Sequence, residues 1–391
     1  MKEAQKKVLM IAPTAFFSHR GYHIRMYEEV KYLEARGYRV KTLAYHLGQN
    51  ITGFDIERII RVPWYTETGP HISLSKIIPD IFLLIKIFFV IRRFKPDILH
   101  CHAHEGALIG IIVNFFFRKK LVIDSQGSLV DALVAYRTIR RRTFLYKLIY
   151  KLENFIYGHS DVILASNQHN ADIMIDLFKI PKEKIYVVDD GISHVHIDQL
   201  LVRELRERFG TSFYKYVLVY CGTMNELEGI DILLQTIAEL AKIRHDFLLL
   251  LMGFPNVEYY KKKVLDLGID HHVKVTGPVS YFDLFSYLSL GTCAVSFKIP
   301  SSEGNLKLVH YSAIGLPVIC FDHAANHYII GDHAVFLDYK KNPAKLAVDM
   351  NVAIDNQGEL RRVAQAAQNL IYNKYSNDVL LRELLKAYSY T

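Results

Sequence analysis

The segment from Pro300 to Pro317 carries residues suited to binding a charged substrate. Its sequence, PSSEGNLKLVHYSAIGLP, places small polar residues before a predicted helix that contains Lys307 and His310. Residues three apart share one face of a helix. The lysine could therefore meet a diphosphate near the helix start, while the histidine could meet a sugar or ribose hydroxyl. The alternative is a surface helix whose lysine is simply solvated.

Two glycine-containing loops follow predicted strands and precede predicted helices. TAFFSHRGY contains Gly21, and CGTMNELEG contains Gly222 and Thr223. Glycine lets the backbone approach a ligand closely, and a helix N-terminus favours an anion. Glu226 and Glu228 would repel a phosphate from the second loop. Ordinary strand-to-helix turns are the alternative for both loops, and no GxGxxG dinucleotide fingerprint is present.

Three histidines alternate in the sequence HCHAH, at His100, His102 and His104. Alternate residues of a strand lie on the same face, so such a run could hold a metal ion. The sequence shows no matching cluster of cysteine, aspartate or glutamate. We therefore expect no metal site, and we interpret the run as strand-end histidines that line a ligand cleft.

These candidate residues are positioned by an alternation of predicted strands and helices. Apolar runs predict strands at 7–13, 38–44, 97–102, 120–124, 161–165, 184–188, 217–222, 246–252, 273–276, 293–297, 317–321 and 334–337. Helical spacing predicts helices at 21–36, 76–94, 142–157, 230–243 and 377–388. Strands separated by helices indicate parallel sheets built from βαβ units. The number of strands is too large for one sheet.

A chain of 391 residues is also too long for one ordinary core, and it fits two domains. The polar segment at 194–212 lacks strand character and is the expected linker. We predict Rossmann-like domains at residues 1–198 and 199–372, and a C-terminal helix at 373–391 that can cross back to the first domain. Ligands of such sheets bind outside the carboxyl ends of the strands, here in a cleft between the domains.

Composition and charge indicate which compartment and which binding partners to expect. Four widely spaced cysteines without a CxxC pair exclude a zinc knuckle and a disulfide framework, and they fit a reducing cytoplasm. The longest apolar stretch, Ile81 to Ile91, contains Lys86 and is shorter than the roughly 20 residues of a membrane span. The net charge of +8 favours an anionic partner. We expect no nucleic-acid partner, because no known binding module is recognisable.

Seven segments, in collinear order from about residue 7 to residue 340, resemble motifs of the family 4 glycosyltransferases. They are SHRGYHIRMYEEVKYLEARGYRV, KPDILHCHAH, SDVILASNQHNADIM, KIYVVDDGIS, VYCGTMNELEGIDILLQTIAEL, HHVKVTGPVSYFDLFSYL and NLKLVHYSAIGLPVI. Members of this family are retaining enzymes with the GT-B fold, in which two doubly wound domains face a cleft. The resemblance implies sugar transfer from a nucleotide diphosphate sugar to a glycan or lipid-linked acceptor, without a metal or another cofactor.

The chain departs from the family pattern where the donor phosphates would bind. The family usually places an arginine and a lysine in the loop after the first strand of the second domain, at the positions of Thr223 and Glu228. Lys307 remains, and it matches a family variant. Charge-assisted bonds to phosphate are strong, so losing two should weaken donor binding. An alternative is therefore a catalytically weak or inactive homologue that acts as a binding or scaffolding subunit.

Further departures concern the family's paired glutamates and an N-domain histidine. The glutamates would fall at Ser302 and His310, with Glu303 one residue late, and Gln126 stands at the histidine position. The expected catalytic residues are His310, Lys307 and Glu303. The expected donor-binding residues are Gly21, Gly222, Thr223, Asn305, Lys307 and Leu308. The expected acceptor-side residues are His19, Arg20, His102 and Gln126. Their main task is to stabilise the leaving diphosphate.

A basic, apolar segment suggests where the acceptor lies. From Arg137 to Lys151, RTIRRRTFLYKLIYK holds six basic residues and no acidic one, and its apolar residues recur at helical spacing. FLLIKIFFVIRRFK and FFFRKK are similar in character. We predict a cytoplasmic protein whose N-terminal domain docks peripherally on an anionic membrane. The alternative is a set of ordinary core helices with a solvated basic rim.

Overall fold

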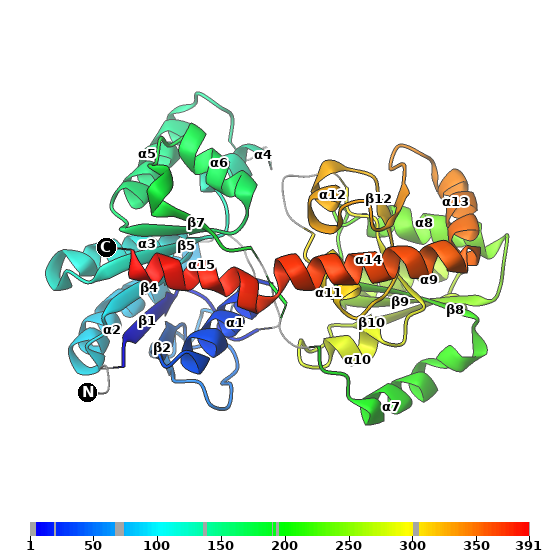
Figure 1. Ribbon diagram of the computed structural model, residues 1–391, viewed down its shortest axis with the longest axis horizontal. Helices are drawn as coiled ribbons and strands as arrows, with labels where there is room; N and C mark the ends of the chain where they lie inside the picture. The colour runs from blue at the N-terminus through cyan, green and yellow to red at the C-terminus, as the bar shows by residue number, and fades with distance from the viewer. Residues whose placement is uncertain are drawn as a thin grey trace. The chain divides into compact units, whose positions relative to one another are not determined.

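The computed structural model describes residues 5–18, 21–66, 74–135, 139–189, 191–192, 195–299 and 305–390. The chain divides into unit 1, formed by Met1–Asp190 and Asn377–Thr391, and unit 2, formed by Gly191–Ser376. Each unit contains one parallel sheet with helices on both faces (Figure 1). The predicted pair of doubly wound α/β domains is confirmed.

The sheet of unit 1 has the strand order β3-β2-β1-β4-β5-β6-β7, and all its pairs are parallel. Its strands are β1 (Lys7–Ala12), β2 (Arg39–Ala44), β3 (Ile56–Arg58), β4 (Ile98–His102), β5 (Lys120–Ser125), β6 (Val162–Ala165) and β7 (Ile185–Val187). Its helices are α1 (Gly21–Ala35), α2 (Ile77–Phe94), α3 (Ala103–Phe117), α4 (Leu129–Ala135), α5 (Phe144–Gly158), α6 (Gln168–Asp176) and α15 (Asn377–Ser389), with short 3-10 turns at Leu74–Lys76 and Lys182–Lys184.

Alternation along the strands of unit 1 produces two cores. Leu9 and Ile11 of β1 face the core formed with α2, α3 and α5, whereas Val8 and Met10 face the core formed with α1 and α15 (Figure 1). Successive side chains of a strand point to opposite faces. Because both faces are covered, the strands are continuously apolar, as is usual in parallel sheets.

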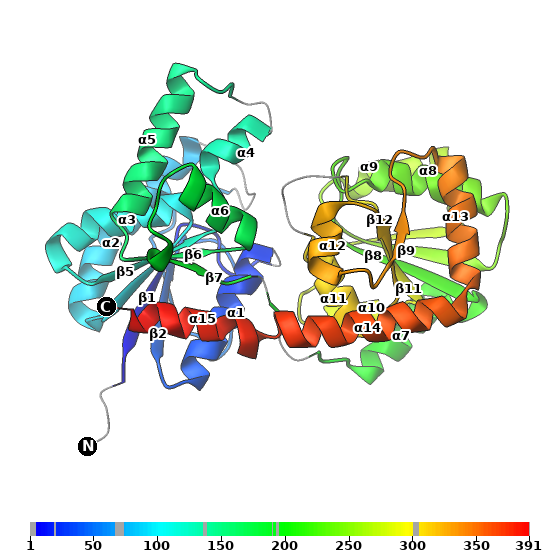
Figure 2. The ribbon, with the colours of Figure 1, turned by 45° about the horizontal axis from the view of Figure 1, so that its top comes forward.

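The sheet of unit 2 has the order β10-β9-β8-β11-β12-β13. Its strands are β8 (Tyr216–Thr223), β9 (Phe247–Phe254), β10 (Val273–Gly277), β11 (Cys293–Ser296), β12 (Val318–Phe321) and β13 (Val335–Leu337). Its helices are α7 (Gln199–Phe209), α8 (Ile230–Ala241), α9 (Val257–Asp266), α10 (Leu284–Leu288), α11 (Lys307–Ala313), α12 (Ala324–Ile330), α13 (Pro343–Asp355) and α14 (Gln357–Tyr375), with a 3-10 turn at Thr211–Phe213. Figure 2 shows α8, α9 and α13 on one face and α10, α11 and α14 on the other.

The unit boundaries differ from the predicted ones, which were at 198 and 372. Ile192 donates a backbone hydrogen bond to Tyr375 at 2.8 Å, so the start and end of unit 2 are held together at that point. The expected linker contains α7, whose N-terminus is capped by Asp198 and whose Val202 and Leu205 are buried. Because its outer face is polar, this helix contains no continuous apolar run that would predict it.

The last helix, α15, packs in unit 1. Leu381, Leu384 and Tyr388 are buried in the core beside α1, and Lys120 donates to the Tyr388 carbonyl at 2.9 Å. Helix α15 therefore covers one face of the first sheet beside α1. None of the helices in the described ranges has both the length and the apolarity required for a membrane span.

Candidate functional site

A carboxylate flanked by two lysines lies at the carboxyl ends of β8 and β11. Lys307, at the start of α11, places Nζ 2.6 Å from Glu228 Oε2, and Lys298, just after β11, places Nζ 3.1 Å from Glu228 Oε1. All three side chains are largely buried. Because β8 and β11 are parallel neighbours, the loops that follow them meet at one edge of the sheet, where ligands of such sheets bind.

Electrostatics explain how these groups coexist. Burial alone would raise the pKa of Glu228, but the charges of Lys307 and Lys298 outweigh it and lower that pKa below its ordinary value. Burial lowers the pKa of Lys307, and the Glu228 charge offsets part of this effect. Two ammonium groups therefore contact one carboxylate. The expectation that Glu228 repels phosphate treated this residue as an isolated carboxylate. In the structure two lysines pair with it.

Sequence reasoning missed Lys298. A lysine immediately after a buried strand, at the edge where ligands bind, was the available signal. Its pairing with Glu228 was not readable, because the two residues lie 70 positions apart in the chain.

The end of β8 brings Gly222 and Thr223 to the same place. A Cβ atom at Gly222 would lie 2.8 Å from Cδ of Lys307, so only glycine leaves room for the lysine stem. The Lys307 Nζ also lies 5.7 Å from the centre of the Tyr220 ring. Tyr220 donates its hydroxyl to the Thr223 carbonyl at 2.6 Å, which fixes the exposed turn. The structure therefore unites three of the predicted donor-side residues.

Two other predicted donor-side residues are structural in this arrangement. Asn305 is buried and donates to Ser296 Oγ at 3.0 Å and to Asn326 Oδ1 at 2.9 Å, which anchors α11 beside β11. The Leu308 side chain lies in the core, and its backbone N–H donates to the Asn305 carbonyl at 3.0 Å. The expected donor contact from Leu308 therefore finds neither a free amide nor an accessible side chain.

His310 lies on α11 one turn after Lys307 and is 7% exposed. Its ring packs against Tyr281 and Phe285, with centroid distances of 6.3 and 6.0 Å, and its Nε2 has no hydrogen-bond partner. Burial, together with the nearby Lys307 charge, lowers the pKa of His310 to about 4. The imidazole is therefore neutral at pH 7, with one nitrogen available to a hydroxyl group.

Acidification should destabilise unit 2 through His310. The pKa of His310 is about 4 in the folded protein, against 6.5 ordinarily. Between these two values His310 is protonated in the unfolded chain but not in the folded protein. The stabilising contribution of the neutral imidazole is fully present above pH 6.5. The free energy of unfolding should fall by about 3 kcal/mol as the pH drops to 4. Urea unfolding of His310→Asn should show a flatter profile over this range, and exposed His271→Asn should not. An equally steep His310→Asn profile would contradict the assignment.

In unit 1, the predicted acceptor-side residues His102 and Gln126 both contact Asp124. His102 Nδ1 lies 3.1 Å from Asp124 Oδ2, and Gln126 Nε2 donates to the same oxygen at 3.0 Å. Gln126 is partly exposed. His102 is completely buried. Direct contact between His102 and an acceptor is therefore not possible in this structure, and its link to the surface runs through Asp124.

Asp124 is held by a buried arginine that sequence reasoning missed. Arg25 on α1 binds it through two hydrogen bonds, of 3.1 Å from Nε to Oδ2 and 2.9 Å from Nη2 to Oδ1. Burial would raise the pKa of Asp124, but Arg25 and the hydrogen bond from His102 hold it well below its usual range. Arg25 Nε also lies 3.3 Å from Glu29 on the same helix.

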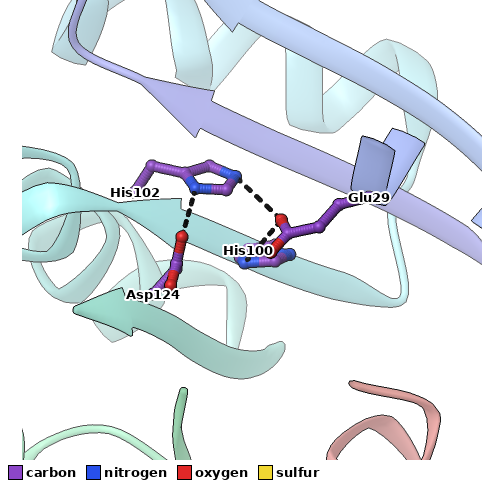
Figure 3. A group of neighbouring side chains, drawn as sticks. All are labelled: Glu29, His100, His102 and Asp124. Carbon is purple, nitrogen blue, oxygen red and sulfur yellow. Dashed lines mark hydrogen bonds and ion pairs between the residues drawn. The ribbon is translucent and has the colours of Figure 1, made fainter. Parts of the chain in front are cut away.

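The alternating histidines separate in the structure. His100 and His102 are stacked on β4 with ring centroids 4.3 Å apart, next to Glu29 (Figure 3). His104 belongs to α3 and instead pairs with Glu153 at 3.2 Å. Gly21 begins α1 and is exposed. Three further predicted residues, His19, Arg20 and Glu303, lie outside the described residues.

Comparison with known proteins gives consistent results for both units. A model described as Glycosyltransferase Family 4 matches residues 20–195, and one described as Glycosyl transferases group 1 matches residues 215–356. An uncharacterised glycosyltransferase of Methanocaldococcus jannaschii is 23% identical over 307 residues, 75% of each chain. D-inositol 3-phosphate glycosyltransferase 1 of Catenulispora acidiphila is 27% identical over 184 residues, 43% of this chain and 42% of the relative.

The fold comparison extends over nearly the whole chain. The crystal structure of HepE from Anabaena in complex with UDP-glucose matches with a TM-score of 0.74 and 14% identity, over 98% of this chain and 99% of that one. This similarity concerns the fold, and the family models supply the sequence relationship. Both matched segments are glycosyltransferase domains, so the chain is a family 4-type glycosyltransferase with the GT-B fold.

Proposed function

We propose that this glycosyltransferase takes its sugar from a nucleotide diphosphate donor bound to unit 2. The observation that carries the proposal is the group of Lys307, Lys298 and Glu228 at the carboxyl ends of β8 and β11, where two largely buried lysines flank one carboxylate. HepE binds UDP and UDP-glucose. That likeness makes a UDP-sugar the first donor to test.

The proposed chemistry is transfer with retention at the anomeric carbon. As the bond from sugar to diphosphate breaks, positive charge develops on the sugar ring and negative charge on the leaving phosphate oxygens. Lys307 and Lys298 supply fixed cations for that negative charge, and preorganised charges of this kind are a major source of rate enhancement. The backbone at Gly222 and Thr223 adds further polarity at the end of β8. This scheme requires no metal ion and no separate cofactor.

His310 is proposed to hold a ribose or sugar hydroxyl of the donor. It occupies the position of a family glutamate, and its neutral imidazole has one buried nitrogen without a partner. A hydroxyl group can donate to or accept from imidazole, depending on the tautomer. A ligand hydroxyl would therefore satisfy a group that is costly to leave unpaired.

The decisive experiment is a screen of nucleotide sugars. A donor that binds only the folded protein should raise the apparent melting temperature, by an amount that grows with the logarithm of its concentration above Kd. The best ligand is then incubated with candidate glycan and lipid-linked acceptors, and release of the nucleotide diphosphate and product stereochemistry are measured. Stabilisation without any turnover would favour the inactive homologue, which the family departures at Thr223 and Glu228 keep as the second candidate. No stabilisation by any donor would refute the proposed site.

We further propose that the acceptor is lipid-linked or membrane-proximal and that unit 1 docks on an anionic membrane. Three neighbouring helices, α2, α3 and α5, leave large apolar side chains exposed on their outer faces. Ile77, Ile81, Ile85 and Phe89 recur every four residues along α2, so they form one stripe. The other exposed members are Ile78, Ile112, Phe115, Phe116, Phe144, Leu145, Leu148, Leu152 and Phe155. These helices therefore bury one face in the core and expose large apolar side chains on another.

Exposed cations border this apolar face, which we call the docking face. They are Arg92, Arg93, Lys95, Arg118, Arg140, Arg141, Arg142, Lys147 and Lys151. Contiguous exposed apolar patches on a protein surface mark contact sites. Each basic residue near an anionic leaflet contributes about 1 kcal/mol, which salt screens. A basic rim around apolar side chains therefore favours a phospholipid surface.

Vesicle flotation should show this docking. The protein should float with anionic phosphatidylserine vesicles at low salt and should be released at high salt. The triple variant Arg140→Glu, Arg141→Glu, Arg142→Glu should lose most of the binding, because three attractive charges become repulsive. Changing three exposed arginines of α7 in unit 2, Arg203, Arg206 and Arg208, to glutamate is the matched control and should leave flotation intact. Absence of flotation at low salt would point to a soluble acceptor.

A further inference from the structure

Two buried histidine nitrogens converge on one carboxylate in the core of unit 1. Nε2 of His100 and Nε2 of His102 each lie 3.9 Å from Oε2 of Glu29 (Figure 3). The two histidines and Glu29 are completely buried. Neither Nε2 atom has a hydrogen-bond partner. Because 3.9 Å is too long for a hydrogen bond, these two buried polar atoms are unsatisfied, which is costly in a folded protein.

The opposite nitrogens of the same rings are already held. His100 Nδ1 lies 2.7 Å from the Tyr388 hydroxyl on α15, and His102 Nδ1 lies 3.1 Å from Asp124 Oδ2 on β5. In metal sites, the histidine nitrogen that does not bind the metal usually contacts a carboxylate, carbonyl or similar group, which fixes the ring orientation. Here that outer support is complete for both rings, and both Nε2 atoms lie at the same distance from one Glu29 oxygen.

We propose that His100 Nε2, His102 Nε2 and Glu29 form a binding site for a zinc ion in unit 1. One ligand atom from each of these residues and from Asp124 lies within 4.8 Å of the others. Two imidazoles and one carboxylate are a known zinc ligand set, which keeps a fourth position for water. Tetrahedral ligands about 2.1 Å from zinc lie roughly 3.4 Å apart. The two 3.9 Å gaps would therefore close by about half an ångström on binding.

The charges of the surrounding groups suit a divalent cation. Glu29 and Asp124 carry two negative charges, and Arg25 returns one positive charge through its two bonds to Asp124. Two carboxylates and one guanidinium give these three side chains one net negative charge in a buried setting. A zinc ion would compensate that charge and would satisfy both histidine nitrogens at once. The site would join α1, β4 and, through the outer contacts, β5 and α15, so metal binding would tie these elements together.

The test uses the full chain, stripped of metal by chelator and returned to zinc at one equivalent. We expect about one zinc per chain by mass spectrometry, and an increase of the melting temperature of at least about 3 °C. X-ray absorption of the zinc-bound protein should show two imidazoles in the metal shell. No tight zinc binding, or a shell without two imidazoles, would overturn the proposal. This readout needs no variant and no activity measurement.

Variants then locate the site. His102→Gln should lose at least nine-tenths of the bound zinc and all of the thermal stabilisation, because glutamine is a poor zinc ligand. His271→Gln, which changes a histidine that is almost fully exposed, should keep both. Equal zinc binding by His102→Gln and the wild type would place the metal elsewhere and would overturn the assignment. If His102→Gln does not fold, the imidazole count in the wild-type shell decides.

Discussion

Replacing Lys307 with alanine should lower kcat/KM for the nucleotide sugar by about two to three orders of magnitude. Loss of one preorganised group that stabilises a developing negative charge costs about that much in other enzymes. The loss of activity should be larger here because Glu228 would lose one of its two lysine contacts. The negative charge of this carboxylate would then repel the incoming diphosphate more strongly. Steady-state kinetics with the best donor from the screen would measure the effect.

Binding measurements separate this role from a general loss of structure. Lys307→Ala should weaken binding of the nucleoside diphosphate far more than binding of the nucleoside, because only the diphosphate carries the charge. Lys261→Ala removes an exposed lysine that is paired with Glu258, and it should leave both affinities unchanged. Equal losses for diphosphate and nucleoside would refute the assignment of Lys307 to the phosphate.

Replacing Asp124 with alanine should destabilise unit 1 by about 3 to 5 kcal/mol. The substitution removes a carboxylate that pairs with a buried arginine, together with the two hydrogen bonds that Arg25 makes to it. Breaking a buried ion pair on one side has that typical cost. Urea unfolding followed by circular dichroism should show the unit 1 transition at a clearly lower urea concentration.

The control is an exposed ion pair in the same unit. Asp378 lies 3.4 Å from Arg36 and is 79% exposed, so Asp378→Ala should cost less than about 1 kcal/mol. The double variant Arg25→Met, Asp124→Leu should recover part of the lost stability, because it removes both charges together. An Asp124→Ala protein as stable as the wild type would show that solvent reaches Arg25 and that the pair is not buried in solution.

Several elements were predictable because their physical cause is local. Buried parallel strands are continuous apolar runs, and the predicted strand at 120–124 is β5 at Lys120–Ser125. The predicted helix at 377–388 is α15 at Asn377–Ser389. The edge strand β3 was not predicted, because three residues with the sequence IER carry no apolar run. Helix α7 was missed because its two buried residues are separated by charged ones.

The sequence also indicated the family and singled out Lys307 as a candidate phosphate contact, since each motif consists of residues close together in the chain. Only the tertiary structure decided what surrounds them. Glu228 gains two lysine partners, and His102 gains Glu29 and Asp124, from elements far away in sequence. The exposure of the stripe on α2 was undecidable as well, because helical periodicity fixes which residues share a face but not whether a partner covers it. Packing between distant segments sets burial, and burial sets the charge and reactivity of each group.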